Sequence, residues 1–267
     1  MKSWTELAWT PNLNALTVSR RSEDFMLNTQ LESQRIVILG GTSGIGLATA
    51  ERAAADGATV IVASSSAERI DAALERLPAS AEGYTVDVRR EEQIRDLFNR
   101  LGSFDHLAFT AGETLQIGAI ADTDLEAARL AVDVRLWGAY AAAKHAVAHL
   151  RPGGSIVLSS GIAGTRPEPD WTVAAAICGA LDALTRALAV ELAPIRVNAV
   201  APGVVRSDLW REMSEEDRAA MYDSLSEALP VGRVGEVGDI AQTFLYLMRN
   251  GYSSGTIVTV DGGSVLV

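Results

Sequence analysis

The chain has 267 residues, of which 34 are acidic and 23 are basic, so its formal net charge is −11. Nucleic acids and anionic membranes are bound through basic patches, and this acidic balance argues against both as partners. The single cysteine, Cys178, excludes an internal disulfide, and three scattered histidines argue against a metal site. With 48% hydrophobic residues and no apolar run that looks long enough to span a bilayer, the composition predicts one cytoplasmic α/β domain.

Residues 1–33 differ from the rest of the chain. They are polar and irregular, contain Trp4 and Trp9, and lack the apolar stretch of about 7–15 residues that a signal peptide needs. Two interpretations stay open. The segment is a flexible extension, with Met26 as an alternative start, or an arm that packs on a neighbouring subunit through its tryptophans.

From Arg35 onward, short runs rich in β-branched residues alternate with longer alanine- and leucine-rich stretches of helical period. This alternation predicts a single Rossmann-type domain over 34–267, a doubly wound parallel sheet of about seven strands with helices on both faces. The expected strands are Arg35–Leu39, Thr59–Ala63, Gly83–Val86, His106–Thr110, Ser155–Ser159, Ile195–Val200 and Thr256–Val260. The expected helices are Ile45–Asp56, Ala67–Arg76, Glu91–Leu101, Leu125–Leu150, Thr172–Glu191 and Val237–Met248.

The segment from about 204 to 235 interrupts this alternation with a polar helical stretch, Ser214–Ala228. In a doubly wound sheet, an insertion at the carboxyl end of a strand usually covers the ligand crevice. We therefore expect a lid here.

A glycine-rich string, Gly40-Gly41-Thr42-Ser43-Gly44-Ile45-Gly46, follows the first strand and opens the first helix. Glycine is needed where backbone must approach a pyrophosphate and a helix must pack closely on a strand. The helix N-terminus then offers unpaired N–H groups and the positive end of its dipole to the anion. In this strand–loop–helix setting, the string predicts dinucleotide binding.

The spacing G-x-x-x-G-x-G resembles that of the short-chain dehydrogenase/reductase family, and further motifs follow in the family's order. Asp87-Val88 ends the third strand, where the family holds adenine, and Thr110-Ala111-Gly112 is similar to its Asn-Ala-Gly turn. Arg196–Gly203 resembles the sixth strand and its Pro-Gly turn, and Val260–Gly263 resembles the C-terminal strand. The resemblance covers roughly 34–267. It implies an oxidoreductase that transfers hydride between a nicotinamide cofactor and a small carbonyl or alcohol substrate.

The resemblance also implies which residues bind the cofactor. They are Gly40, Thr42, Ser43, Gly44, Ile45, Gly46, Ser64, Ser65, Asp87, Val88, Ala111, Gly112, Pro202, Gly203 and Val205.

The end of the second strand bears on the choice between NAD and NADP. An acidic residue there would accept the ribose hydroxyls and repel a 2′-phosphate. The chain has Ser64, Ser65 and Ser66 instead, with Arg69 as a possible counter-charge. An arginine is also missing at Ser43 and Ser65, where NADP enzymes often carry one. The missing acid favours NADP, with NAD as the alternative.

The positions that correspond to the family's tyrosine, lysine, serine and asparagine are Ala174, Cys178, Gly161 and Arg135. All four family catalytic residues are therefore replaced. A Tyr-x-x-x-Lys spacing does occur at Tyr140 and Lys144, but on the helix before the fifth strand, whereas the family pair lies on the helix after it. We interpret it as coincidental.

Arg135, Glu113 and Ser160 are the candidate catalytic residues, because each is polar and expected to face the pocket. Arg135 would stabilise negative charge on an oxygen, and Glu113 would donate or accept a proton. Equally, Glu113 and Arg135 would form an ion pair that only holds the pocket together.

Three hypotheses of function remain. The first is an NADP-dependent oxidoreductase with a substituted proton relay. The second is a cyclase, isomerase or lyase in the same pocket, and the third is a catalytically silent nucleotide-binding protein. Long alanine-rich helices at Leu125–Leu150 and Thr172–Glu191 predict a homotetramer, or a dimer, through helix pairing across a twofold axis.

Overall fold

The computed structural model describes residues 31–112 and 117–267. In this part of the chain a parallel sheet of seven strands runs in the order β3-β2-β1-β4-β5-β6-β9. The predicted doubly wound α/β fold is confirmed. The strands are β1 (Arg35–Leu39), β2 (Thr59–Ser64), β3 (Glu82–Thr85), β4 (Phe104–Phe109), β5 (Leu150–Ser159), β6 (Arg196–Pro202) and β9 (Ile257–Val260).

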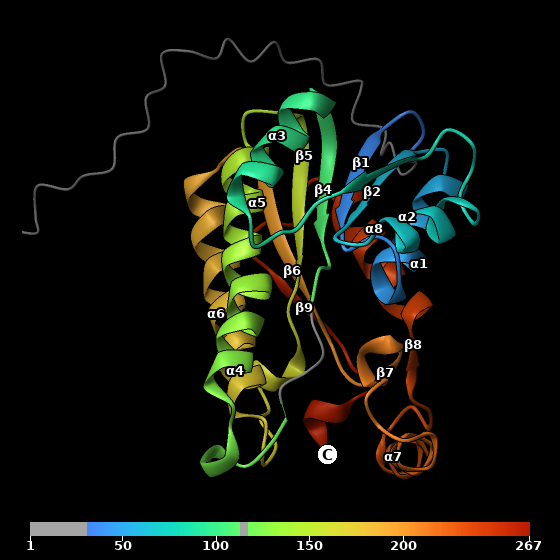
Figure 1. The fold of residues 1–267 in the computed structure, drawn as a ribbon, viewed down its shortest axis with the longest axis vertical. Helices are drawn as coiled ribbons and strands as arrows, with labels where there is room; N and C mark the ends of the chain where they lie inside the picture. The colour runs from blue at the N-terminus through green and yellow to red at the C-terminus, as the bar shows by residue number, and fades with distance from the viewer. Residues whose placement is uncertain (1–30, 113–116) are drawn as a thin grey trace, which may run out of the picture.

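Helices cover both faces of the sheet (Figure 1). On one face lie α3 (Glu91–Leu101), α4 (Leu125–Val132), α5 (Gly138–Ala146) and α6 (Thr172–Glu191). The other face is covered by α1 (Gly44–Ala55), α2 (Ala67–Leu74) and α8 (Val237–Arg249).

Alternate side chains of one strand enter opposite cores, because the side-chain period of a strand is two. Val37 and Leu39 pack toward α3–α6, whereas Ile36 and Ile38 pack toward α1 and α8. Leu31 is also fully buried, so packing begins shortly before the predicted domain boundary at residue 34. Almost all of the predicted extension, residues 1–30, lies outside the described residues.

The single helix predicted over Leu125–Leu150 is wrong in two respects. A turn of π-helix, η4 (Asp133–Trp137), separates α4 from α5, and α5 ends at Ala146. Leu150 instead opens β5, where it pairs with Phe104. The apolar side chain of Leu150 continues the helical spacing, so periodicity alone could not distinguish a last helical turn from the start of a strand.

The segment predicted to be a lid is tied down at its base. Two short strands, β7 (Val205–Arg206) and β8 (Gly235–Glu236), pair in parallel at its two ends. Helix α7 (Glu215–Ala228) lies between them, as the polar helical stretch predicted. Within this segment Trp210 is buried against Tyr222 and Val234, and its Nε1–H donates to the carbonyl oxygen of Val205 at 3.0 Å.

Helix α6 corrects the expectation that no apolar run is long enough for a bilayer. The helix has 20 residues, and an 18-residue window within it has a mean hydropathy of 1.7, enough to cross a membrane by length and composition only. Its buried residues recur at helical spacing and pack on the sheet, and they make up 28% of that window.

A polar row crosses the buried middle of the sheet. His106 of β4 is 3% exposed and stands between Ser155 of β5 and Gln34 before β1. Gln34 Oε1, 2.7 Å away, can only accept, so His106 Nε2–H donates to it and the Ser155 hydroxyl donates to Nδ1 at 2.8 Å. Burial lowers the pKa of His106 to about 4, with the positive charge of Arg196 acting in the same direction.

The buried His106 should make the folded protein lose stability as the pH falls from about 6.5 toward 4. Because the folded pKa of His106 lies below the unfolded value of about 6.5, the unfolded state binds more protons between these two values. Stability is complete above about pH 6.5 and falls as the pH approaches 4, with a loss of about 2 kcal/mol between pH 7 and 5. Urea unfolding at both pH values measures it. In His106→Gln the loss should nearly vanish, and an equal loss in this variant would contradict the assignment.

Candidate functional site

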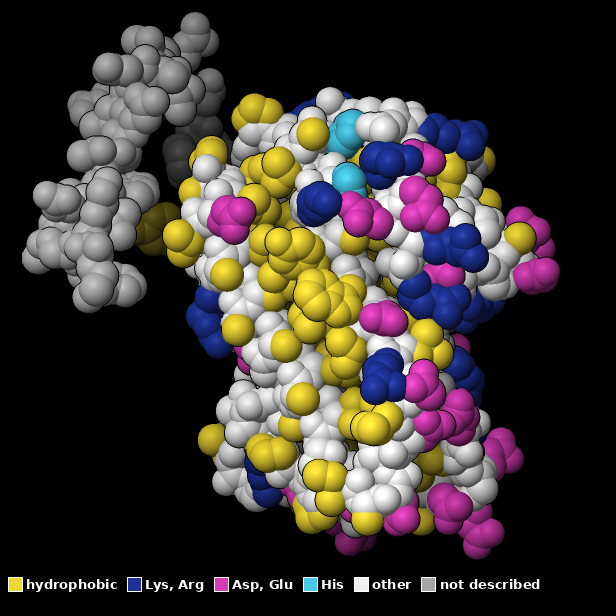
Figure 2. All heavy atoms as spheres, turned by 60° about the vertical axis from the view of Figure 1, so that its left-hand side comes forward, with side chains coloured by type: hydrophobic (Ala, Val, Ile, Leu, Met, Phe, Trp, Pro, Cys, Tyr) yellow, Lys and Arg dark blue, Asp and Glu magenta, His cyan; other side chains and the backbone are white. Residues whose placement is uncertain are grey.

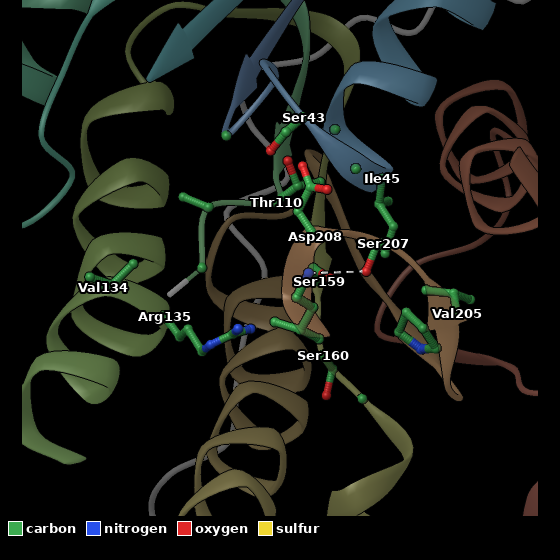
Figure 3. A pocket seen from close by; sticks show the side chains of 18 of the residues that line it. Ser43, Ile45, Thr110, Val134, Arg135, Ser159, Ser160, Val205, Ser207 and Asp208 are labelled. Atoms are coloured by element: carbon green, nitrogen blue, oxygen red, sulfur yellow. Dashed lines mark hydrogen bonds between the residues drawn. The ribbon is translucent and has the colours of Figure 1, made fainter. Parts of the chain in front are cut away.

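A cavity of about 260 Å³ opens at the carboxyl edge of the sheet, beneath the lid (Figure 3). Every residue predicted for cofactor binding lines this cavity, as do Arg135 and Ser160. They come from the ends of β1, β2, β4, β5 and β6, from the residues after β3, and from the turn before α5. Glu113, the third catalytic candidate, lies outside the described residues.

The glycine loop leaves no room for side chains at two of its positions. A Cβ atom at Gly46 would lie 2.2 Å from the carbonyl oxygen of Gly40, and one at Gly40, whose φ is +90°, would lie 2.4 Å from the nitrogen of Ala111. Glycine therefore lets the first turn of α1 touch the loop and lets β1 end against β4. The Ser43 side chain makes no capping hydrogen bond, so it leaves the N-terminal amides of α1 available to a ligand, and Gly44–Gly46 line the cavity.

The other end of the cavity, at β2 and β3, is positively charged. Arg69 and Arg89 both line it, beside Ser65 and Asp87. Arg69 Nη2 lies 3.5 Å from Ser65 Oγ, and Arg89 Nη2 lies 2.6 Å from Asp87 Oδ2. The hydrogen bonds from Arg89 hold the pKa of the Asp87 carboxyl below its usual range. The sequence analysis missed Arg89. Its position two residues after Asp87, just beyond the end of a strand, could have indicated that it lies at the nucleotide site.

Arg135 lies in the π turn η4, and its side chain points into the cavity (Figure 3). A Cβ atom at Gly112 would stand 2.7 Å from the Arg135 guanidinium carbon, so the guanidinium lies flat against the backbone at the end of β4. The thiol of Cys178 is close enough to feel this charge. Burial nevertheless raises the pKa of Cys178 above its usual value, which keeps the thiol neutral at pH 7.

The two serines at the end of β5 point in different directions. Ser160 follows Ile156 and Leu158, which face α6, and its hydroxyl lies 2.6 Å from Asp182 Oδ1 on that helix. Ser159 shares the opposite face with Val157, which packs toward α1. Asp182 is a second residue that the sequence analysis missed, since nothing in a sequence pairs two positions on different elements. The catalytic role of Ser160 stays a prediction.

Tyr140 and Lys144 lie away from the cavity. Lys144 Nζ donates to Glu91 Oε1 at 2.7 Å on the surface, and the half-exposed Tyr140 ring packs edge-on against Trp137. Neither residue lines the cavity. Their place in the fold agrees with the interpretation that their spacing is coincidental.

Known proteins resemble this chain in sequence and in fold. A family model described as enoyl-(acyl carrier protein) reductase matches residues 40–264. The short-chain dehydrogenase/reductase fsr5 of Gibberella fujikuroi is 34% identical over 258 residues, covering 89% of this chain and 97% of the relative.

Two solved structures are also similar to this chain in fold. A small-chain dehydrogenase in complex with NADPH is 37% identical, with a TM-score of 0.78 over 88% of this chain and 100% of the other. The MalC reductase/Diels–Alderase of Malbranchea aurantiaca is 27% identical, with a TM-score of 0.82 over 89% of this chain and 98% of the other.

Proposed function

Because the chain belongs to the short-chain dehydrogenase/reductase family, we propose that it is an NADP(H)-dependent oxidoreductase acting on a small carbonyl or alcohol substrate. The observation that carries the proposal is the glycine loop, whose backbone leaves a cradle that a Cβ atom at Gly46 would fill. A similar protein whose structure holds NADPH supports the choice of nucleotide. The cytoplasmic location remains a prediction.

Different residues along the cavity bind different parts of the nucleotide. The amides of Gly44–Gly46 hold the pyrophosphate, and Asp87 and Val88 hold the adenine. Adenosine then lies over β2 and β3, where Arg69, Ser64 and Ser65 bind the 2′-phosphate. Asp87 does not repel that phosphate, because Arg89 pairs with its carboxylate.

Arg69 provides the test for NADP over NAD. An arginine–phosphate contact is a charge-assisted hydrogen bond, so Arg69→Ala should raise the Kd for NADPH about tenfold or more and leave the Kd for NADH within about twofold. Fluorescence titration measures both constants. Arg95→Ala is the matched control, because Arg95 pairs with Asp96 on the surface outside the cavity. An equal loss for the two nucleotides would refute the 2′-phosphate site.

At the chemical end we propose that Arg135 binds the substrate oxygen and stabilises negative charge on it. When bound, the nucleotide supplies the hydride. Glu113 is proposed as the group that exchanges the proton, or as the ion-pair partner of Arg135. Ser160, held by Asp182, completes the set at the end of β5.

A second candidate function is a non-redox reaction in the same pocket. MalC, which is described as both a reductase and a Diels–Alderase, favours it. An arginine that polarises a carbonyl oxygen would serve a ring-forming reaction as well as a hydride transfer. Single-turnover measurements with and without NADPH distinguish the two functions, since only the redox reaction consumes the nucleotide.

Substitutions of Arg135 should lower kcat/KM strongly, whereas substitutions of Tyr140 and Lys144 should change it little. Arg135→Leu should lower kcat/KM about 10²- to 10³-fold, because it removes the charge on the developing oxyanion. Tyr140→Phe and Lys144→Met should change it only a few-fold, because both side chains lie outside the cavity. An inactive Tyr140→Phe beside an active Arg135→Leu would show that the site has been assigned to the wrong helix.

The outer surface of α4, η4 and α5 suggests self-association. Apolar side chains gather on this face (Figure 2), and Leu125, Leu130, Trp137 and Tyr140 are all exposed to solvent. We propose a homotetramer, with a dimer as the alternative, in which this face is covered by a second copy. Light scattering at micromolar concentration should give a multiple of the chain mass, 28.3 kDa. The mass of a single chain would rule it out.

A further inference from the structure

The half of the cavity that lies over β5 and β6, where Arg135 is proposed to bind the substrate, is here called the chemical half. One of its walls consists of small side chains. Gly161 and Ala163 come from the end of β5 and the turn η5 (Ile162–Gly164), and Ala174 comes from the first turn of α6. On the next turn of α6, Cys178 adds a short neutral thiol. A wall of such short side chains leaves room for a broad ligand beside α6.

This wall is held in place by backbone contact. A Cβ atom at Gly164 would lie 2.9 Å from the nitrogen of Gly179 and 3.1 Å from Cys178 Cβ, so η5 lies directly on α6. Because η5 and α6 touch here, the wall cannot close inward without breaking their packing. The free space is therefore part of the fold.

Several polar groups around this space are already hydrogen-bonded inside the protein. The Ser160 hydroxyl donates to Asp182, the Trp210 Nε1–H to the Val205 carbonyl, and the Thr110 hydroxyl to the Leu39 carbonyl at 3.2 Å. Their hydrogens are therefore not free to bind a ligand, and only the Ser160 and Thr110 hydroxyl oxygens can still accept a hydrogen bond. A ligand rich in hydroxyls would leave many of them unpaired, and each unpaired group costs affinity.

Arg135, in the π turn η4, contributes a positive charge to this half of the cavity. On the lid side, the Asp208 carboxylate points toward the glycine loop (Figure 3). Trp171 adds an aromatic surface next to Ala174 at the start of α6. The half thus combines short, mostly apolar side chains beside α6 with the Arg135 guanidinium, a hydrogen-bond donor, and it has Ser159, Ser207 and Asp208 on its other sides.

We propose that the substrate is an apolar compound of two or more fused rings that carries a carbonyl oxygen, and that Ala174 sets this preference. The inference rests on the proposed function, since Arg135 is taken to bind the reacting oxygen. A rigid ring body fills the space beside α6 and loses little conformational entropy on binding. A sugar, with its many hydroxyls, and a flexible acyl chain both fit this wall less well.

Calorimetric titration of the NADPH complex tests the proposal with 2-decalone, cyclohexanone and glucose as probes. The bicyclic ketone should bind about tenfold or more tightly than cyclohexanone, because its second ring buries further apolar surface. Glucose should show no saturable binding. Cyclohexanone affinities close to those of 2-decalone, or tight binding of glucose, would overturn the proposal.

Ala174→Leu should weaken 2-decalone binding about tenfold or more, because its larger side chain fills the space beside α6. Its Kd for NADPH should stay within about twofold. The control is Ala176→Leu, on the same helix but exposed and outside the cavity, which should bind both ligands like the parent. If Ala174→Leu does not fold, Gly161→Ala adds one methyl group to the same wall and should weaken 2-decalone binding several-fold. Unchanged 2-decalone affinity in the folded variant would overturn the role of Ala174.

The same titrations without nucleotide separate this inference from the proposed function. A parent protein that binds 2-decalone, loses this binding in Ala174→Leu, and does not bind NADPH would refute the proposed function and leave the inference standing. A parent that binds NADPH but no ring ketone would refute the inference alone.

Discussion

The first turn of α1 touches the loop that precedes it, and this contact fixes the geometry of the whole carboxyl edge. A side chain at Gly46 would overlap the carbonyl of Gly40 and the hydroxyl of Thr110, while one at Gly40 would overlap the backbone of Ala111. Three segments therefore meet without intervening side chains: the end of β1, the start of α1 and the end of β4. Because they meet there, the amides of α1 open directly into the cavity. The two halves of the cavity then lie on either side, over β2 and β3 and over β5 and β6.

The chemical half depends on a second local feature, the π turn that carries Arg135. A π turn widens the helix by one residue and is often found at functional sites. Here it places the guanidinium against Gly112, where a side chain larger than hydrogen would displace it. The guanidinium of Arg135 is half-buried and lines the cavity at the end of β4, a place that suits a role in binding oxygen. The neighbouring Gly161, Ala174 and Cys178 then determine how much space a ligand has beside that charge.

Most of the fold could be predicted from the sequence because parallel strands are buried on both faces. The runs Ile36–Leu39 and Val60–Ala63 are apolar throughout, and such runs between helical stretches have few other interpretations. The start of β5 at Leu150 and the π turn could not be predicted. The start of β5 depends on its pairing with Phe104, and both features interrupt an apparently continuous helical period.

The candidate site was predictable to a different degree in its two halves. The residues predicted to bind the nucleotide follow strand ends in a recognisable order, and the structure brings them into one cavity. The sequence contains no comparable motif that indicates in which direction a side chain points. Ser160 was predicted to face the pocket, but its hydroxyl donates to Asp182, 22 positions along the chain. Likewise, only the fold shows that Arg89 pairs with Asp87 and lines the cavity.

The most direct test of this account is a fluorescence titration of NADPH with the parent protein, Gly46→Ala and Gly179→Ala. Gly179 lies in α6 with nothing within 4 Å of its Cβ position, so this variant controls for adding a methyl group to a helical glycine. The account predicts micromolar binding to the parent and to Gly179→Ala. It predicts binding at least about tenfold weaker to Gly46→Ala, because the added methyl group separates α1 from the loop. Equal affinity in Gly46→Ala, or no binding to the parent, would contradict the claim that the glycine loop at the carboxyl edge holds the nucleotide.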